Sequence, residues 1–426
     1  MKYADFALLG NMLNRIKAYG ELMAEYGASG EVDRIAEELK TQLTSALESI
    51  KSLPGTAERE PNDYVSIRKE CRGGNVPVKP ITGLRERMAG AVLGRFAGCT
   101  LGAPVEMWSI EKMQMLAAHC GTEFPPKDYW TVVDSAYHVR YGVDKCQMYT
   151  RDGMNGVPVD DDITYTILGL LIVERYGFGF TTEDVGEIWK ELLPYACTAE
   201  DVALRNLKAG IPAAHAAETD NPYCQWIGAD IRADGFAFAA AGNPELAAAM
   251  GYRDAYLSHR RNGIYGEMFF AAAIAAAFTV DDPIEAIRIA LREIPSGCAL
   301  YKDIEWALEA GGPLPDYLSA RNAVDERFAG MSQVHTNNNA CLTVFGLMLG
   351  KGDFTQTISN VVAMGMDNDC TGATAGSIIG AIVGRDGIPG HWTARFNDRV
   401  RTYLNNLPEF SIEDVISRFV NLAKRF

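Results

Sequence analysis

The sequence predicts an all-α protein, and two observations support this fold class. Segments along the chain have helical patterns, most clearly residues 31–53, where apolar residues recur at spacings of three and four as on the buried face of a helix. Segments in which polar and apolar residues alternate, as in a half-buried strand, are scarce. The glycine-rich motifs that bind phosphate in sheet-based nucleotide-binding folds are also absent.

The composition of the 426-residue chain is that of an ordinary globular protein, with 48% hydrophobic and 22% charged residues. A formal net charge of −15 argues against non-specific binding to nucleic acids or anionic membranes. We expect no transmembrane helix, because no apolar run reaches about 18 residues without a charge.

The nine cysteines occur singly, and the first residues lack the apolar core of a secretory signal. We therefore expect reduced thiols and a cytoplasmic protein. The six histidines also occur singly, which argues against the paired ligand spacing of a zinc site.

Two helices are expected at the N-terminus, over residues 4–27 and 31–53. The second has the clearer pattern, with apolar residues three or four positions apart: Val32, Ile35, Leu39, Leu43, Leu47 and Ile50. Four prolines mark residues 54–80 as a linker or surface strap. We predict that residues 1–78 form a helical extension without chemistry and that residues 79–426 form the main domain.

The main domain is expected to begin with a helix of small residues over 85–101. Residues 121–157 are irregular, which is typical of a lid or binding loop, although core packing would explain most of their aromatic side chains. These side chains are Tyr129, Trp130, Tyr137, Tyr141 and Tyr149. Further helices are expected over residues 163–176, 244–257, 266–278, 282–291, 336–350, 353–363 and 412–426.

Two clusters of aspartates each precede a predicted helix. Asp367 and Asp369 come before a run of small residues, which favours a helix packed closely against another backbone. Asp160, Asp161 and Asp162 come before an apolar helical pattern. Carboxylates so close together repel each other, and burial raises their pKa unless a cation is present. Because Mg²⁺, Mn²⁺ and Ca²⁺ take oxygen ligands, the clusters predict one metal site built from two helix N-termini.

Two other interpretations of the acidic clusters were considered. Each cluster alone also fits a helix N-cap with solvated acids, since Asp is common there. A calcium-binding EF-hand loop beginning at Asp367 is excluded, because its twelfth position needs a bidentate Glu and is Ile378 here.

These motifs resemble those of the ADP-ribosylglycohydrolase family, which includes the enzyme that releases ADP-ribose from dinitrogenase reductase. The family pattern near the C-terminus is Gly-x-Asp-Thr-Asp-Thr followed by a small-residue helix, and Asp367 and Asp369 match its aspartates. Asp161 and Asp162 match an earlier Thr-Asp-Asp-Thr pattern. Glu106 matches a family glutamate that lies near the scissile bond.

The chain departs from the family at several of these positions. Asp160 and Ile163 replace the two threonines of the earlier motif, and Cys370 replaces the threonine that follows the second C-terminal aspartate. Cys99 stands where the first family motif usually has an aspartate. We expect Asp160 and Thr371 to supply oxygen ligands that these changes remove.

The resemblance implies an orthogonal bundle of many helices with a binuclear metal site in a central cleft. It implies two Mg²⁺ ions, or Mn²⁺ in their place, held by the oxygen ligands Asp160, Asp161, Asp162, Asp367, Asp369 and Thr371. Glu106, Asp161 and Asp369 are the expected catalytic residues, and no aspartate is assigned as the base.

The expected substrate contacts are Asn155, Gly156, Gly228, Arg232 and His259. Gly228 and Arg232 lie in a segment that resembles the family's contact with bound ADP-ribose, where Arg232 would pair with phosphate. A structural arginine at a helix end is the alternative for Arg232. His259 taken alone is more often a structural histidine, and Ser258 beside it is not expected to form a Ser–His dyad with it.

The implied reaction is hydrolysis of the glycosidic bond at the anomeric ribose carbon of an ADP-ribose conjugate. Two alternatives stay open: a related metal-dependent N-glycosidase acting on a free nucleotide or nucleoside, and a non-enzymatic structural relative. The retained aspartates argue against the structural relative. The sequence does not identify the acceptor group, which is Arg, Ser, a nucleic acid or a small molecule.

Overall fold

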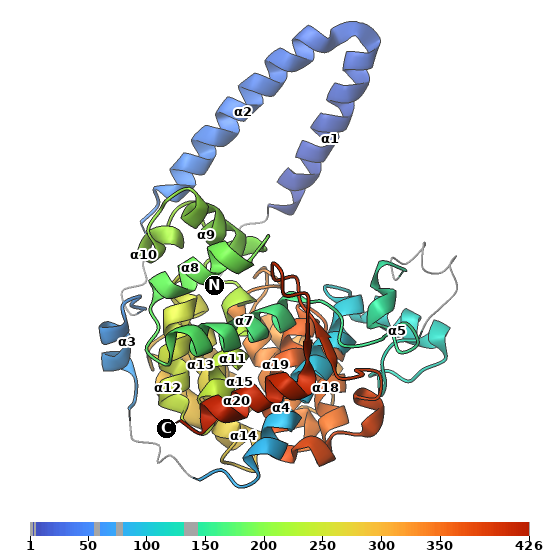
Figure 1. The fold of residues 1–426 in the computed structure, drawn as a ribbon. Helices are drawn as coiled ribbons and strands as arrows, with labels where there is room; N and C mark the ends of the chain where they lie inside the picture. The colour runs from blue at the N-terminus through green and yellow to red at the C-terminus, as the bar shows by residue number, and fades with distance from the viewer. Residues whose placement is uncertain (1–2, 4–5, 55–59, 74–79, 132–143, 426) are drawn as a thin grey trace. The chain divides into compact units, whose positions relative to one another are not determined.

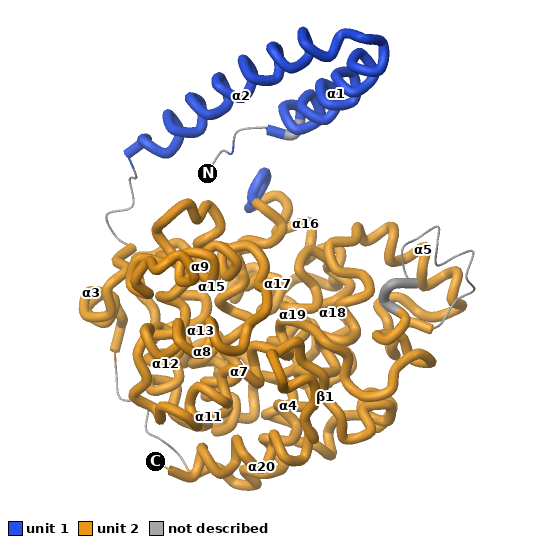
Figure 2. The backbone as a smooth tube through the Cα atoms, turned by 45° about the horizontal axis from the view of Figure 1, so that its top comes forward, with its two compact units in different colours: residues 1–58, 328–331 blue, residues 59–327, 332–426 orange. Residues whose placement is uncertain are grey.

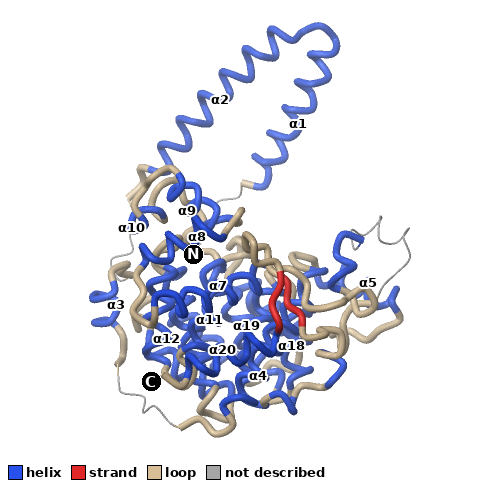
Figure 3. The backbone as a smooth tube through the Cα atoms, viewed as in Figure 1, coloured by secondary structure: helices blue, strands red, loops and turns tan. Residues whose placement is uncertain are grey.

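A computed structural model of the chain describes residues 3, 6–54, 60–73, 80–131 and 144–425. Within these residues nearly all regular structure is helical (Figures 1 and 3). The strands of this described part, β1 (Arg399–Arg401) and β2 (Glu409–Ser411), form one short antiparallel ladder with Val400 opposite Phe410. The predicted all-α fold class is confirmed.

The helices predicted after residue 80 correspond to α4, α7, α12, α13, α14, α17, α18, α19 and α20. The bounds of all described α-helices are α1 (Ala7–Met23), α2 (Ser29–Lys51), α3 (Tyr64–Glu70), α4 (Leu84–Gly102), α5 (Ile110–Cys120), α7 (Asp161–Tyr176), α8 (Thr182–Leu192), α9 (Thr198–Lys208), α10 (Ala213–Ala216), α11 (Ala233–Ala239), α12 (Pro244–Ala255), α13 (Asn262–Ala277), α14 (Pro283–Ala290), α15 (Ala299–Ala310), α16 (Tyr317–Arg327), α17 (Thr336–Gly350), α18 (Phe354–Ala363), α19 (Asn368–Val383) and α20 (Ile412–Ala423).

The chain divides into two compact units, which Figure 2 shows in different colours. One unit comprises Met1–Glu58 with Phe328–Met331, and the other comprises Arg59–Arg327 with Ser332–Phe426. In the first unit, the two predicted N-terminal helices form a hairpin, α1 and α2, joined by a π-helical turn over Ala24–Ala28. Both acidic clusters belong to the second unit.

The predicted linker over residues 54–80 contains a helix, α3, that the sequence analysis missed. The carboxylate of Asp63 caps this helix by accepting a hydrogen bond from the Ser66 amide at 2.9 Å, and Ile67 is fully buried. Because α3 belongs to the second unit, the compact units divide nearer the N-terminus than the predicted boundary at 78/79. A helix of 7 residues is too short to show helical periodicity among four prolines.

At the centre of the second unit, α4 and α19 pack backbone against backbone. A Cβ atom added to Gly98 would lie 1.9 Å from the Gly372 carbonyl oxygen, and one added to Gly94 would lie 2.2 Å from that of Gly376. The small residues of both helices therefore serve close packing, as predicted for the segment after Asp369.

Gly98→Ala is expected to lower the free energy of unfolding by about 3 kcal/mol, the upper end of the usual range for overpacking, because its Cβ meets backbone rather than a flexible side chain. Urea denaturation measures this change. Gly179→Ala is the matched control, since a Cβ at this exposed glycine meets no atom within 4 Å and should change stability by less than about 0.5 kcal/mol. Equal effects of the two substitutions would contradict the close packing.

One helical stretch of the described residues, Leu84–Val105, is long and apolar enough to cross a membrane by length and composition. However, 94% of this stretch is buried inside the protein. Its apolar character is explained by its packing against α19 in the core.

Candidate functional site

The N-termini of three helices, α7, α9 and α19, meet at one cavity of about 230 Å³ in the second unit. The lining residues come mainly from these N-termini, from the 3₁₀ turn over Ile227–Arg232, and from Glu106. They are Glu106, Asp161, Tyr165, Cys197, Thr198, Glu200, Trp226, Ile227, Gly228, Ile231, Val334, Asp367, Asp369 and Cys370. The partial positive charge of three helix N-termini favours the acids gathered there.

The two aspartate clusters, separated by about 200 residues in sequence, meet at this cavity. Asp160 caps α7 by accepting a hydrogen bond from the Asp162 amide at 3.1 Å, which places Asp161 in the first turn beside the cavity. Asp367 is the residue before α19 and Asp369 lies in its first turn. The two clusters thus belong to one site, as the sequence predicted.

The close packing of α4 and α19 also brings Glu106 to the aspartates. Gly102 lies against the backbone of Asp369, since a Cβ on Gly102 would be 2.4 Å from the Asp369 nitrogen. The chain then turns, and the Met107 amide donates to the Met366 carbonyl at 2.9 Å. As a result, carboxylate oxygens of Glu106, Asp367 and Asp369 lie within 4.8 Å of one another.

The ligand atoms of these carboxyl groups are close enough together to share a cation. One oxygen of Asp367 and one of Asp369, both Oδ1, are buried and have no hydrogen-bond partner among the described residues. Burial raises the pKa of both carboxyls, and it raises the pKa of Asp160 well above its usual value, with the neighbouring Asp161 charge adding to the effect. Buried carboxylate oxygens without a hydrogen-bond partner are suitable ligands for a divalent cation.

Glu106 stands at the exposed rim, but its carboxyl faces the buried aspartates. Desolvation, followed by the charges of Asp367 and Asp161, raises the pKa of Glu106 to about 7. A carboxyl with this pKa exchanges a proton near neutral pH, which is a property of general acids and bases.

Stability of the metal-free protein is expected to fall as pH rises from about 4.5 to 7. The pKa of Glu106 is raised to about 7 in the folded protein, so the folded state binds more protons than the unfolded state across this window. Urea denaturation at pH 5.5 and 7.5 tests this, and Glu106→Gln should show a shallower dependence. A divalent cation should also reduce the slope, because it favours the charged carboxyls. A slope that Glu106→Gln leaves unchanged would contradict the assignment.

Asp162 is held by a buried arginine rather than facing the cavity. An Nη atom of Arg95 lies 3.0 Å from Asp162 Oδ1, and the same guanidinium pairs with Asp234 at 2.7 Å. The other oxygen, Asp162 Oδ2, accepts from the Cys370 thiol at 3.1 Å. Asp162 is therefore oriented by Arg95 and turned toward Cys370.

The hydroxyl of the expected ligand Thr371 is engaged within its own helix. It donates to the Asp367 carbonyl at 3.0 Å, which is a common contact within a helix turn. Instead, Cys370 lies with Asp162 and Asp369 in a group whose ligand atoms are within 4.8 Å of one another. Thr371 as a ligand therefore stays a prediction, while the neighbouring Cys370 is the residue whose side chain lies within the group.

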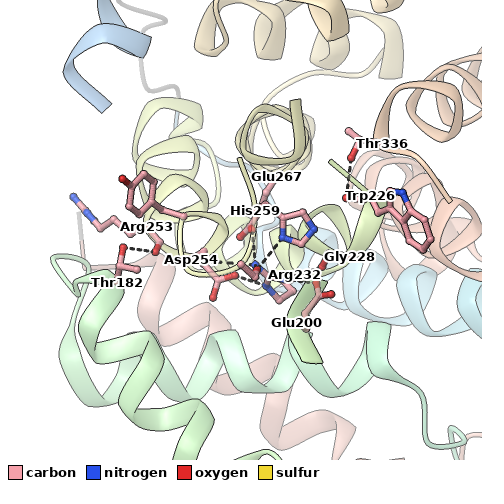
Figure 4. A network of polar contacts seen from close by, with 12 residues as sticks. Thr182, Glu200, Trp226, Gly228, Arg232, Arg253, Asp254, His259, Glu267 and Thr336 are labelled. Atoms are coloured by element: carbon pink, nitrogen blue, oxygen red, sulfur yellow. Dashed lines mark hydrogen bonds and ion pairs between the residues drawn. The ribbon is translucent and has the colours of Figure 1, made fainter. Parts of the chain in front are cut away.

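Arg232 does not face the cavity, which corrects its predicted pairing with phosphate. Figure 4 shows its guanidinium enclosed by carboxylates. It forms ion pairs with Asp254, with Glu200 at 2.5 Å and with Glu267 at 3.4 Å, and it donates to Ser258 Oγ at 3.0 Å. Only 1% of the Arg232 side chain is exposed. The structural alternative considered for Arg232 is the one observed.

Gly228 does line the cavity, and the structure shows why no side chain fits there. A Cβ on Gly228 would lie 2.2 Å from Glu200 Oε1. Glu200 thus forms part of the wall while its carboxylate pairs with Arg232 behind the wall. Burial raises the pKa of Glu200 to about 7 in spite of that pairing.

His259 is buried in the Arg232 network and does not line the cavity, so its predicted contact with substrate is corrected. Its Nδ1 lies 2.8 Å from Ser258 Oγ. This contact between adjacent side chains was not expected. The same Ser258 hydroxyl also accepts from Arg232, and Figure 4 shows His259 beside Arg232. Burial, together with the positive charge of Arg232, lowers the pKa of His259 well below its usual value.

Asn155 and Gly156 are likewise not among the residues that line the cavity. The Asn155 side chain accepts from Asn397 at 2.9 Å, and the Gly156 amide donates to Arg395 at 2.9 Å. Gly156 has a φ of 95°, which glycine adopts without strain, so this pair forms a turn anchored to the C-terminal segment.

Part of the predicted aromatic loop over residues 121–157 is packed in the core. Tyr129 and Trp130 are buried, and they donate to the Trp392 carbonyl at 2.8 Å and the Leu101 carbonyl at 3.0 Å. Tyr137 and Tyr141 lie outside the described residues. A predicted role as a lid or binding loop therefore stays a prediction.

Sequence reasoning missed two groups of functional-site residues. Arg95 carried a detectable signal, because a charged residue within an apolar, small-residue helix indicates a buried ion pair. Trp226 lies in the segment that resembles the family's ADP-ribose contact, so its neighbourhood carried a signal. Cys197 and Glu200 carried none, since they lie in a segment without a recognisable pattern and only folding brings them to the cavity.

Two comparisons with known proteins found matches. The sequence profile of the ADP-ribosylglycohydrolase family matches residues 80–422. A solved structure of an ADP-ribosylglycohydrolase-related protein complex is similar, with a TM-score of 0.53 and 19% sequence identity over 80% of this chain and 98% of that chain. At this identity the likeness shows the fold alone. No curated protein matches the chain.

Proposed function

Because this chain belongs to the ADP-ribosylglycohydrolase family, we propose that it is a metal-dependent hydrolase of ADP-ribose conjugates. Membership supports a glycohydrolase at the level of the family. The finer proposal is that the enzyme cleaves the bond between the anomeric ribose carbon and the acceptor group, and that it requires divalent cations.

One observation carries this proposal: unpartnered, buried carboxylate oxygens of Asp367 and Asp369 face Glu106 in a cavity. A structural protein gains nothing from such an arrangement, because buried polar groups without partners destabilise the fold. Sites that bind and react with a ligand commonly retain them.

The cations, which we expect to be two Mg²⁺ or Mn²⁺ ions, would be held by Asp160, Asp161, Asp162, Asp367 and Asp369. When bound, they supply positive charge that neutralises these carboxylates and attracts the oxygen atoms of a ribose diol. The protein contributes the fixed positions of the carboxylates at two helix N-termini.

Proton transfer is assigned to the carboxylates that line the cavity. Hydrolysis forms a bond from the anomeric carbon to a water oxygen and breaks the bond to the acceptor. A carboxylate takes one proton from that water, and the acceptor atom gains one. Glu106 has the pKa for holding or releasing a proton near pH 7, and Asp161 and Asp369 are the neighbouring candidates.

The cavity is small for a whole ADP-ribose conjugate. Its volume of about 230 Å³ lies below the roughly 300–1,000 Å³ of pockets that enclose drug-sized ligands. We infer that it encloses the ribose at the scissile bond and that the diphosphate and adenosine lie outside it. Trp226 and Tyr165 provide the aromatic part of its wall.

The test is release of ADP-ribose from a panel of conjugates in the presence of Mg²⁺ or Mn²⁺. The panel contains ADP-ribosyl-arginine, ADP-ribosyl-serine, ADP-ribosylated nucleic acid and O-acetyl-ADP-ribose. At least one should be cleaved, EDTA should stop the reaction, and free ADP-ribose should compete. Glu106→Gln should reduce turnover by roughly 10²–10⁴-fold, the usual contribution of a general acid or base.

Other outcomes would identify the alternatives. Loss of a base from free nucleotides or nucleosides, with no conjugate cleaved and no ADP-ribose bound, would favour the N-glycosidase. Absence of any metal binding by calorimetry would favour the non-enzymatic relative.

A further inference from the structure

A sulfur atom lies among the carboxylates of the metal site. Cys370 is in the first turn of α19, and its Sγ is 3.1 Å from Asp162 Oδ2. This Sγ and carboxylate oxygens of Asp162 and Asp369 all lie within 4.8 Å of one another. All three side chains are buried, with Asp162 at 0% and Cys370 at 7% exposure.

Two carboxylate oxygens of this group are not paired with a cationic side chain. Asp162 Oδ1 is taken by Arg95, so Oδ2 is the oxygen that faces Cys370. Asp369 Oδ1 is buried and has no hydrogen-bond partner among the described residues. Arg95 also pairs with Asp234 at 2.7 Å, so its single positive charge is shared between Asp162 and Asp234. The carboxylates around Cys370 therefore keep a net negative charge.

We propose that Cys370 is a sulfur ligand to a divalent cation held together with Asp162 and Asp369, and that this position prefers a transition-metal ion such as Co²⁺ or Zn²⁺ over Mg²⁺. The proposal rests on the metal site of the proposed function, but it does not depend on the substrate.

The chemistry of the donors explains the preference. Mg²⁺ is a hard ion that takes six oxygen ligands at 2.0–2.1 Å, whereas thiolate sulfur favours softer first-row ions. Ligation exchanges the thiol proton for the cation, and that proton goes to solvent. In the structure the Cys370 thiol donates a hydrogen bond to Asp162 Oδ2. The two atoms that would both bind the cation are therefore already adjacent.

Two other thiols were compared with Cys370. Cys197 lines the same cavity but belongs to no group of three ligand atoms among the described residues. Cys99 is buried on α4 and also belongs to no such group. Cys370 is therefore the thiol that the geometry selects, and Cys197 is the rival that an experiment must exclude.

The test uses the full chain, stripped of metal with EDTA and titrated with Co²⁺. Sulfur ligation gives a thiolate-to-cobalt charge-transfer absorption in the near ultraviolet, which oxygen ligands alone do not give. The absorption should appear in the unmodified protein, in Cys197→Ser and in Cys120→Ser, whose thiol belongs to no group of three ligand atoms among the described residues. It should be absent in Cys370→Thr.

Cation preference is the second measurement. Cys370→Thr should weaken Co²⁺ binding at least about tenfold relative to Mg²⁺ binding, as measured by competition calorimetry. Cys370→Ser serves as a second variant if the threonine chain does not fold. If neither variant folds, the proposal is judged by whether the charge-transfer absorption appears in the unmodified protein and is retained in Cys197→Ser.

Three results would overturn the proposal: no charge-transfer absorption in the unmodified protein, its persistence in Cys370→Thr, or its loss in Cys197→Ser. These failures differ from failure of the proposed function. Conjugate cleavage without the absorption would retain the hydrolase and reject the sulfur ligand. The absorption without cleavage of any conjugate would retain the sulfur ligand and reject the hydrolase.

Discussion

Asp369→Asn is expected to abolish the metal response of the protein and to reduce its hydrolytic activity strongly. Asp369 belongs to two groups of potential ligands, one with Glu106 and Asp367 and one with Asp162 and Cys370. Removing the charge of Asp369 therefore weakens cation binding at both groups. Since bound cations contribute several kcal/mol to a transition state, turnover should fall by about 10²–10³-fold or more.

The stability measurement is independent of the substrate. Mg²⁺ at about 100 times its Kd should stabilise the unmodified protein by about 2.7 kcal/mol, and Asp369→Asn should lose this gain. Asp353→Asn is the matched control. Asp353 also stands at a helix N-terminus, where it accepts from the Gln356 amide at 2.7 Å, but it lies outside the acidic groups of the described chain. A full metal response in Asp369→Asn would reject the site.

Arg232→Met is expected to destabilise the protein by about 3–5 kcal/mol, because it leaves buried carboxylates without their cation. Arg232 faces Asp254, Glu200 and Glu267, all of which are buried. Urea denaturation measures the loss. Any fall in activity should follow the loss of folded protein rather than a rise in KM for the conjugate.

Arg175→Met is the control for Arg232→Met. Arg175 pairs with Glu191 at 2.7 Å, but its side chain is 49% exposed and that of Glu191 is 55% exposed. Such a pair contributes about 0–1 kcal/mol, so little change is expected. A stable Arg232→Met protein with a raised KM would instead restore the role in phosphate binding.

Much of the architecture could be predicted from the sequence because it depends on neighbours along the chain. Apolar spacing predicted the long helices, and small residues predicted that α19 packs closely against another backbone, which the structure shows to be that of α4. Aspartates before two helical patterns predicted the acidic N-termini, which the fold joins at one cavity. The same local reasoning failed for α3, where 7 residues give too few turns for a period to show.

The sequence by itself determined which segments are helical and that their N-termini carry carboxylates, because helix periodicity and capping depend on residues within a few positions of each other. Only the tertiary structure decided which way each side chain faces and which residues it contacts. Arg232 and Gly228 are one turn apart, yet one is buried among carboxylates from three other helices and the other lines the cavity. Contacts between groups distant in sequence depend on how whole helices pack, and no local pattern encodes that choice.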